Sequence, residues 1–154
     1  EISKLAQVAR AQNLSGDWSL PRPMKNSGDY DFSFSGIKTA VRYAVEKKGE
    51  LTNENKLTLA REFEDAVVEV LVAKAMSACN EHGASTLIVG GGVIANQYLR
   101  AQLEKICTEK GINLLLPTLE TSTDNATMIA IAAFFHQNES AGADEIRARG
   151  NLKL

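Results

Sequence analysis

The chain has 154 residues, of which 44% are hydrophobic and 23% charged, and its formal net charge at pH 7 is −2. This length and composition allow one globular domain whose core needs neither disulfides nor a structural metal. The slightly acidic balance excludes a chain that is basic over its whole surface, so any contact with nucleic acid must be local or shared with another part of the protein.

Membrane insertion and secretion are not expected from this sequence. No apolar run approaches the roughly eighteen residues that a membrane-spanning helix needs, and the first residues, EISKLAQVAR, lack the layout of a signal peptide. The two cysteines, Cys79 and Cys107, lie in separate helical patterns without CxxC spacing, which is typical of small buried apolar residues in a reducing compartment. We therefore expect a cytoplasmic protein that makes no membrane contact.

The first predicted helix begins almost at residue 1, because apolar residues recur there at helical spacing, namely Ile2, Leu5, Ala6 and Ala9. No capping residue precedes it, so we expect a fragment or a processed product. Residues 14–30 are rich in Ser, Gly, Pro and Asn and predict a surface loop that is longer than most connections, as functional loops often are.

The segment DFSFSG predicts a short half-buried strand, because Phe32 and Phe34 alternate with Ser33 and Ser35. Gly36 then leads into a helix that ends at Gly49. The inward face of this helix is predicted from its spacing to carry Ile37, Ala40, Val41, Ala44 and Val45.

Residues 54–82 give the strongest helical pattern, with Thr52 or Asn53 as the amino-terminal cap and Gly83 as the terminator. One apolar stripe contains Phe63, Val67, Val70 and Leu71. Val68 and Val72 form a second stripe, so we expect this helix to be buried on more than one side.

The remainder alternates strand and helix. Residues 86–89 predict a strand that is covered on both faces, residues 96–110 a helix, residues 112–117 another buried strand, and residues 125–137 a helix. The polar tail that follows carries a small basic cluster, interpreted here as a solvated end: Arg147, Arg149 and Lys153. The order predicts an α/β domain, richer in helix than in strand, with parallel strands joined by right-handed crossovers.

Ligands of such sheets bind beyond the carboxyl ends of the strands, which directs attention to residues 90–96 and 118–124. In LIVGGGVIAN, Gly90, Gly91 and Gly92 let a ligand approach the backbone, and the helix that starts near Asn96 offers free amides to an anion. The alternative is a tight turn with Asn96 as an ordinary helix cap.

Two further segments carry polar groups at helix starts. In TSTDNATMIA, Asp124 could bind a cation, or it could cap the following helix. In SFSGIKTA, the side chains that could bind an anion are Ser33, Ser35, Lys38 and Thr39, although an exposed strand face with a solvated lysine is the slightly favoured explanation. The sequence shows no Ser-His-Asp, Cys-His or HExxH pattern.

Three segments in register, DFSFSGIKTAV, GGGVIANQYLR and TDNATMIAIA, resemble the tRNA adenosine threonylcarbamoyltransferases, a family once named O-sialoglycoprotein endopeptidases. The resemblance covers essentially the whole chain. It implies that residues 1–154 form the carboxyl-terminal half of an actin/hexokinase-like protein, without its amino-terminal half. We expect a helix-rich α/β domain with a small, partly parallel sheet.

The resemblance also implies roles for individual residues. Asp124 would join two histidines of the missing half around one divalent metal ion, iron or zinc. Asn96, following Gly91 and Gly92, would contact the nucleotide of threonylcarbamoyl-AMP. Ser3 would also touch this ligand, although many family members have aspartate at its position.

The implied reaction transfers the threonylcarbamoyl group to the exocyclic amine of the adenosine next to the tRNA anticodon. The implied partners are tRNA, the amino-terminal half and accessory subunits, and we expect this half alone to be inactive. No catalytic base can be assigned in it. The alternatives are a non-catalytic nucleotide-binding scaffold of an actin-like complex and a metalloprotease.

Overall fold

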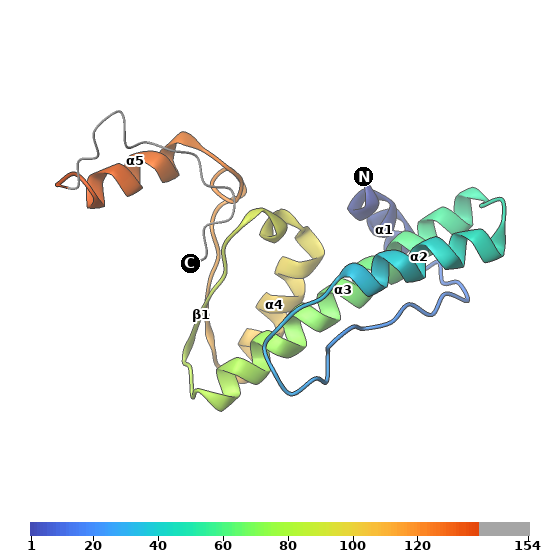
Figure 1. Ribbon diagram of the computed structural model, residues 1–154, viewed down its shortest axis with the longest axis horizontal. Helices are drawn as coiled ribbons and strands as arrows, with labels where there is room; N and C mark the ends of the chain where they lie inside the picture. The colour runs from blue at the N-terminus through green and yellow to red at the C-terminus, as the bar shows by residue number, and fades with distance from the viewer. Residues whose placement is uncertain (139–154) are drawn as a thin grey trace.

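The computed structural model describes residues 1–138. Figure 1 shows the elements in chain order, in which η1 is a short 3-10 helix. They are α1 (Ile2–Ala11), α2 (Ser35–Lys48), α3 (Asn53–Glu81), β1 (Thr86–Ile88), η1 (Gly92–Ala95), α4 (Gln97–Lys110), β2 (Asn113–Leu115) and α5 (Ala126–Phe135). All five predicted helices are confirmed, whereas η1 was not predicted.

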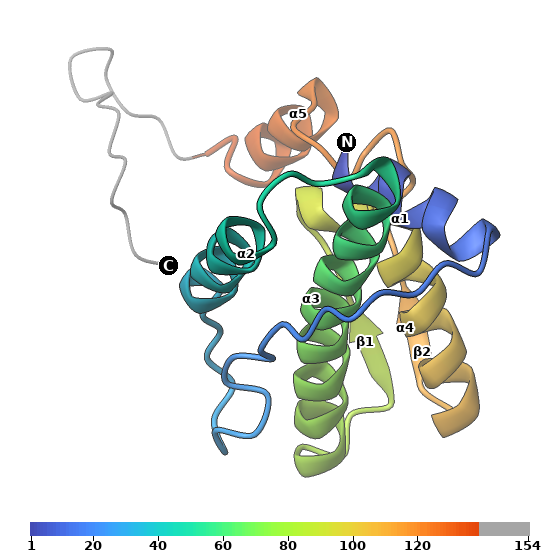
Figure 2. The same ribbon diagram turned by 90° about the vertical axis from the view of Figure 1, so that its right-hand side faces the viewer.

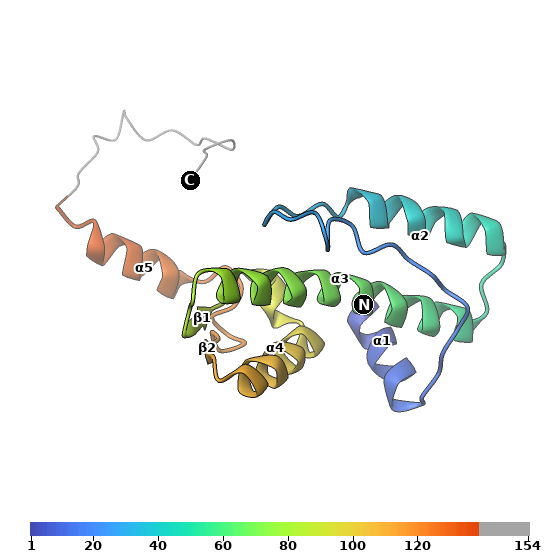
Figure 3. The ribbon, with the colours of Figure 1, turned by 90° about the horizontal axis from the view of Figure 1, so that it is seen from below.

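The long helix α3 forms the centre of the molecule. Thr52 caps it, as one of the two predicted candidates, because its hydroxyl accepts a hydrogen bond from the Asn55 amide at 3.1 Å. Helix α2 lies on one side of α3, and α1 and α4 lie on the other (Figures 2 and 3). The predicted burial of α3 on more than one side is therefore confirmed.

Three apolar clusters fill the spaces around α3. One joins α3 to α2 and the long loop through Leu20, Ile37, Leu59 and Ala66. The second joins it to η1 and α4 through Val68, Ile94, Leu99 and Leu103. The third contains both cysteines, Cys79 and Cys107, packed with Met76, which confirms them as small buried apolar residues.

The sheet within residues 1–138 consists of two parallel strands, paired from Thr86 with Asn113 to Ile88 with Leu115. This confirms the predicted parallel pairing with a helical crossover. Leu87 and Leu114 face the core, but Ile88 is 75% exposed and Leu115 is 48% exposed. The prediction that both strands are covered on both faces is wrong for the described residues, because helices pack on one face only.

Residues 31–34 do not form the predicted strand. No strand of the described chain pairs with them, and a strand needs such a partner for its backbone hydrogen bonds. The rings of Phe32 and Phe34 instead stack on each other with centroids 6.2 Å apart. Helix α2 starts directly at Ser35.

The predicted long loop is confirmed and extends over residues 12–34. Hydrogen bonds and ion pairs fasten it to α3 along its length. The buried Lys74 ammonium donates to the Asp29 carboxylate and to its backbone carbonyl, both at 2.8 Å. Arg22 pairs with Glu62 and Glu69. These ion pairs hold the loop across the outer surface of α3.

Helix α5 lies apart from the other helices (Figure 1). None of its residues is buried, and its exposed large apolar side chains are Met128, Ile129, Ile131, Phe134 and Phe135. None of the helices within residues 1–138 is both long and apolar enough to cross a membrane. The basic cluster of Arg147, Arg149 and Lys153 lies outside the described residues.

Candidate functional site

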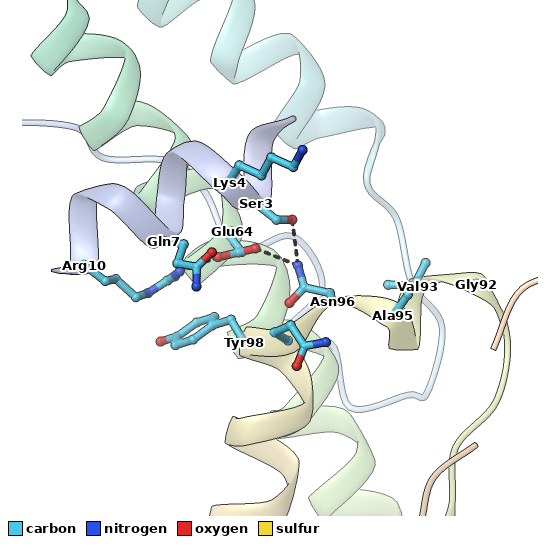
Figure 4. Close-up of a pocket in the computed structure, with 11 residues that line it drawn as sticks. Ser3, Lys4, Gln7, Arg10, Glu64, Gly92, Val93, Ala95, Asn96 and Tyr98 are labelled. Carbon is cyan, nitrogen blue, oxygen red and sulfur yellow. Dashed lines mark hydrogen bonds and ion pairs between the residues drawn. The ribbon is translucent and has the colours of Figure 1, made fainter. Parts of the chain in front are cut away.

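A cavity of about 760 Å³ lies between α1, α3 and the turn that connects β1 to α4. Figure 4 shows its lining side chains. Three of the residues singled out in the sequence meet there: Ser3 from α1, Gly92 from the glycine turn, and Asn96 at the start of α4. Because these segments are far apart in the chain, the fold itself assembles this site.

The side chain of Asn96 makes three hydrogen bonds that connect the elements around the cavity. Its Oδ1 accepts a hydrogen bond from the Leu99 amide at 2.8 Å, so the residue does cap α4, as one interpretation predicted. Its Nδ2 group donates to Ser3 Oγ at 3.0 Å and to Glu64 Oε1 at 2.6 Å. Both amide hydrogens are therefore in use, while Oδ1 keeps one lone pair for a ligand.

Glu64 connects Asn96 to α1. Its carboxylate is 6% exposed and forms an ion pair with Arg10, whose guanidinium also pairs with Asp65. A buried carboxylate is costly unless it is paired and hydrogen-bonded, and Glu64 is both. The residue thus fixes the amide of Asn96 and holds α1, α3 and the start of α4 together.

The aromatic ring of Tyr98 completes this wall. The Arg10 guanidinium carbon lies 3.4 Å from the centroid of the Tyr98 ring, which is close enough for a cation–π contact. Burial, followed by the negative charge of Asp65, raises the pKa of the Tyr98 phenol. Burial alone would lower the pKa of Arg10, but its hydrogen bonds to Asp65 and Glu64 raise it overall. Both side chains therefore keep their protons near neutral pH.

The glycine turn is open toward the space around it. Gly91 has φ = +87°, a conformation that favours glycine. A Cβ atom at Gly90, Gly91 or Gly92 would meet no atom within 4 Å in residues 1–138, apart from the glycine itself and its two chain neighbours. Arg100 holds the turn by donating to the Ile94 and Pro117 carbonyls, both at 2.7 Å. Arg100 thus fixes the backbone of the turn, while the space beside the three glycines stays free for a ligand.

Asp124 does not reach this cavity and does not cap α5. The cap is its neighbour Asn125, whose Oδ1 accepts a hydrogen bond from the Met128 amide at 3.1 Å. Asp124 is exposed and, within residues 1–138, has no hydrogen-bond or ion-pair partner. The capping interpretation of Asp124 is therefore wrong, and its carboxylate is available to a ligand.

The third candidate segment, which contains Ser33, Ser35, Lys38 and Thr39, surrounds the start of α2. Thr39 Oγ1 donates to the Ser35 carbonyl at 3.2 Å within the helix. Lys38 instead lines an apolar cavity of about 510 Å³ together with Gly90 and Val93. The start of α2 and the glycine turn therefore line the same cavity.

Sequence reasoning missed Glu64 and Arg10. A signal for Glu64 was present, because it lies four residues after Ala60 and four before Val68, and both of these are buried in α3. An acidic residue on a buried helical face is rare unless it is paired. Arg10 gave no comparable signal, because α1 ends there and a cation in the last turn is ordinary.

Comparison with known proteins identifies similar sequences. The family described as tRNA N6-adenosine threonylcarbamoyltransferase matches residues 1–131. A protein of that name from Thermosipho africanus is 40% identical over 158 residues, which is 100% of this chain and 46% of the relative. Proteins of the same name from Variovorax paradoxus and Burkholderia lata are 45% and 43% identical over 84% and 94% of this chain, and over 36% and 43% of their own lengths. The chain thus spans less than half the length of these relatives.

Proposed function

The chain belongs to the tRNA N6-adenosine threonylcarbamoyltransferase family, and we propose that the protein carrying it modifies tRNA. The reaction transfers a threonylcarbamoyl group from threonylcarbamoyl-AMP to the exocyclic amine of the adenosine next to the anticodon. The substrates are tRNA and the adenylate, and the compartment is the cytoplasm. The fold would be one actin/hexokinase-like domain, completed by an amino-terminal half and served by accessory subunits.

The observation that carries this proposal is the meeting of Ser3, Gly92 and Asn96 around one cavity. Its volume, about 760 Å³, lies within the range of small-molecule sites, roughly 300–1,000 Å³. A nucleotide placed there would lie on the open backbone of the glycine turn, beside the start of α4. The free lone pair of Asn96 Oδ1 would accept a hydrogen bond from a base amine or a ribose hydroxyl.

The family resemblance assigns the implied metal ion to Asp124, and its carboxylate can accept one, because it is exposed and unpaired within residues 1–138. In the same residues, no three His, Cys, Asp or Glu side chains lie together as a metal site would require. Its partners would be histidines of the amino-terminal half. A bound iron or zinc would supply Lewis acidity toward the oxygens of the adenylate. Asp124 would contribute one negative ligand from the start of α5.

The reaction can be tested in cells by replacing the host gene for the modification with the complete gene that carries this sequence. We expect nucleoside mass spectrometry of the tRNA to detect threonylcarbamoyladenosine at a level comparable to that of the host enzyme. An inactive control carries Gly91→Val, which forces a β-branched residue into a glycine conformation. If the native gene is expressed as folded protein and the nucleoside is absent, the transferase proposal fails.

Asn96→Ala tests the nucleotide site separately. We expect the affinity for AMP, measured by calorimetry, to fall about tenfold, the equivalent of one hydrogen bond of about 1.4 kcal/mol. The metal content should not change. Because this substitution also removes a helix cap, Asn125→Ala, which removes the cap of α5, is the matched control. Equal AMP affinity in the native protein and the Asn96 variant would remove Asn96 from the site.

The two alternative functions receive no support from these observations. The relatives are all named as transferases, which favours neither a scaffold nor a metalloprotease.

A further inference from the structure

Helix α2 differs in charge from the rest of the chain. It carries four cations, Lys38, Arg42, Lys47 and Lys48, and one carboxylate, Glu46, which gives a net charge of +3 over 14 residues. Since the whole chain has a net charge of −2, all its other residues together carry −5. The negative net charge of the whole chain is thus compatible with a locally positive surface at α2.

The cations of α2 are also freer than most others. Elsewhere, Arg10, Arg22 and Lys74 pair with carboxylates that are distant in sequence. On α2, Arg42 pairs only with Glu46 of the same helix, and both side chains are more than half exposed. Such surface pairs contribute little. Lys38 and Lys47 have no hydrogen-bond or ion-pair partner in the described part of the chain.

Aromatic rings accompany these cations. Tyr43 is 59% exposed, and the guanidinium of Arg42 lies 5.5 Å from its ring centroid. The Lys48 ammonium lies 5.7 Å from the ring of Trp18. Exposed cations next to an exposed aromatic ring are the combination that binds nucleic acids, through phosphate attraction and base stacking.

The position of α2 links this surface to the candidate site. Lys38, in its first turn, lines the same cavity as Gly90 and Val93, and Val93 also lines the cavity of Asn96. From there α2 runs along the outside of α3 (Figure 3). At 1.5 Å per residue its 14 residues extend over about 21 Å, enough to follow several phosphates of one strand.

We propose that the exposed cations of α2, Lys38, Arg42, Lys47 and Lys48, bind the phosphate backbone of the tRNA substrate. The inference rests on the proposed function, because that function requires a tRNA. The first of these cations, Lys38, lies beside the glycine turn, so a strand held along α2 can present an adenosine to a nucleotide bound there.

The test compares two double substitutions in the complete gene product. Lys47→Gln with Lys48→Gln removes two charges from the end of α2, and Lys105→Gln with Lys110→Gln removes two exposed charges from the end of α4. Binding of tRNA transcript is measured by fluorescence anisotropy at several salt concentrations. For the α2 variant we expect an affinity about tenfold lower near 0.15 M salt and a salt slope smaller by about 1.5, which corresponds to two lost phosphate contacts.

The α4 variant should bind tRNA like the native protein, and both variants should bind AMP like it. Equal tRNA affinities of the native protein and the α2 variant would overturn the proposal. Equal losses in both variants would also overturn it, because the effect would then follow net charge and not the surface of α2. If the native protein itself bound no tRNA, the proposed function would be wrong. The proposal for α2 would then be rejected as well, because it depends on that function.

Discussion

Replacing Asp124 with alanine is expected to abolish formation of threonylcarbamoyladenosine and to lower the metal content of the protein, with little change in stability. The carboxylate has no hydrogen-bond or ion-pair partner within residues 1–138, so its removal breaks no contact there. Loss of one charged ligand from a metal site with three protein ligands should leave the ion weakly held. Elemental analysis, nucleoside mass spectrometry and urea unfolding measure the three effects.

Two neighbouring substitutions separate the explanations for an inactive Asp124 variant. Glu120→Ala removes a carboxylate from the same loop and should leave activity and metal content unchanged. Asn125→Ala removes the actual cap of α5 and should lower helix stability by about 1 kcal/mol without removing a metal ligand. If the Asp124 variant kept its metal and its activity, the carboxylate would not be a ligand.

Local sequence signals predicted the helices well. Apolar spacing located α3, and the capping residues Thr52 and Asn96 were both among the candidates identified in advance. A cap depends on a hydrogen bond to a backbone amide only a few residues away, so the local sequence contains most of the required information. The same holds for the left-handed Gly111 at the end of α4.

The two wrong predictions about strands concern interactions between distant segments. The alternation of Phe32 and Phe34 has the period of a strand, but a strand also needs a partner, and none pairs with it in the described chain. Likewise, the apolar run of β1 indicates burial on both faces, yet Ile88 is 75% exposed. A run of apolar residues indicates that both faces of a strand favour burial. It does not indicate which segment of the protein covers each face.

The residues of the candidate site were likewise predicted only in part. The resemblance to a family singled out Ser3 and Asn96, which are 93 residues apart and share a hydrogen bond. It did not single out Glu64, which receives the shorter bond from Asn96, because Glu64 lies in a helix whose pattern is dominated by apolar residues. Its position on the buried face of α3 was a sequence signal, but its partners become visible only in the structure, where α1 and the start of α4 lie on either side of it (Figure 4).

Glu64→Leu is expected to destabilise the fold by about 2–4 kcal/mol, because it leaves the buried end of Arg10 and one amide hydrogen of Asn96 without their acceptor. Glu64→Gln should cost less, since its amide oxygen can still accept from Asn96. Urea unfolding measures both. The matched control is Glu69→Leu on the same helix. The Glu69 carboxylate is 45% exposed in its pair with Arg22, so this change should cost about 1 kcal/mol or less.

A double-mutant cycle with Arg10→Leu isolates the interaction itself. If Glu64 and Arg10 act as a pair, removing both should cost less than the sum of the two single changes, by about 1–3 kcal/mol. The double variant should still bind AMP more weakly than the native protein, because the amide of Asn96 has lost the carboxylate that orients it. Additive stability losses with unchanged AMP affinity would show that Glu64 merely fills space in α3. A coupled loss with weakened AMP binding would instead show that the ion pair orients Asn96 for the ligand.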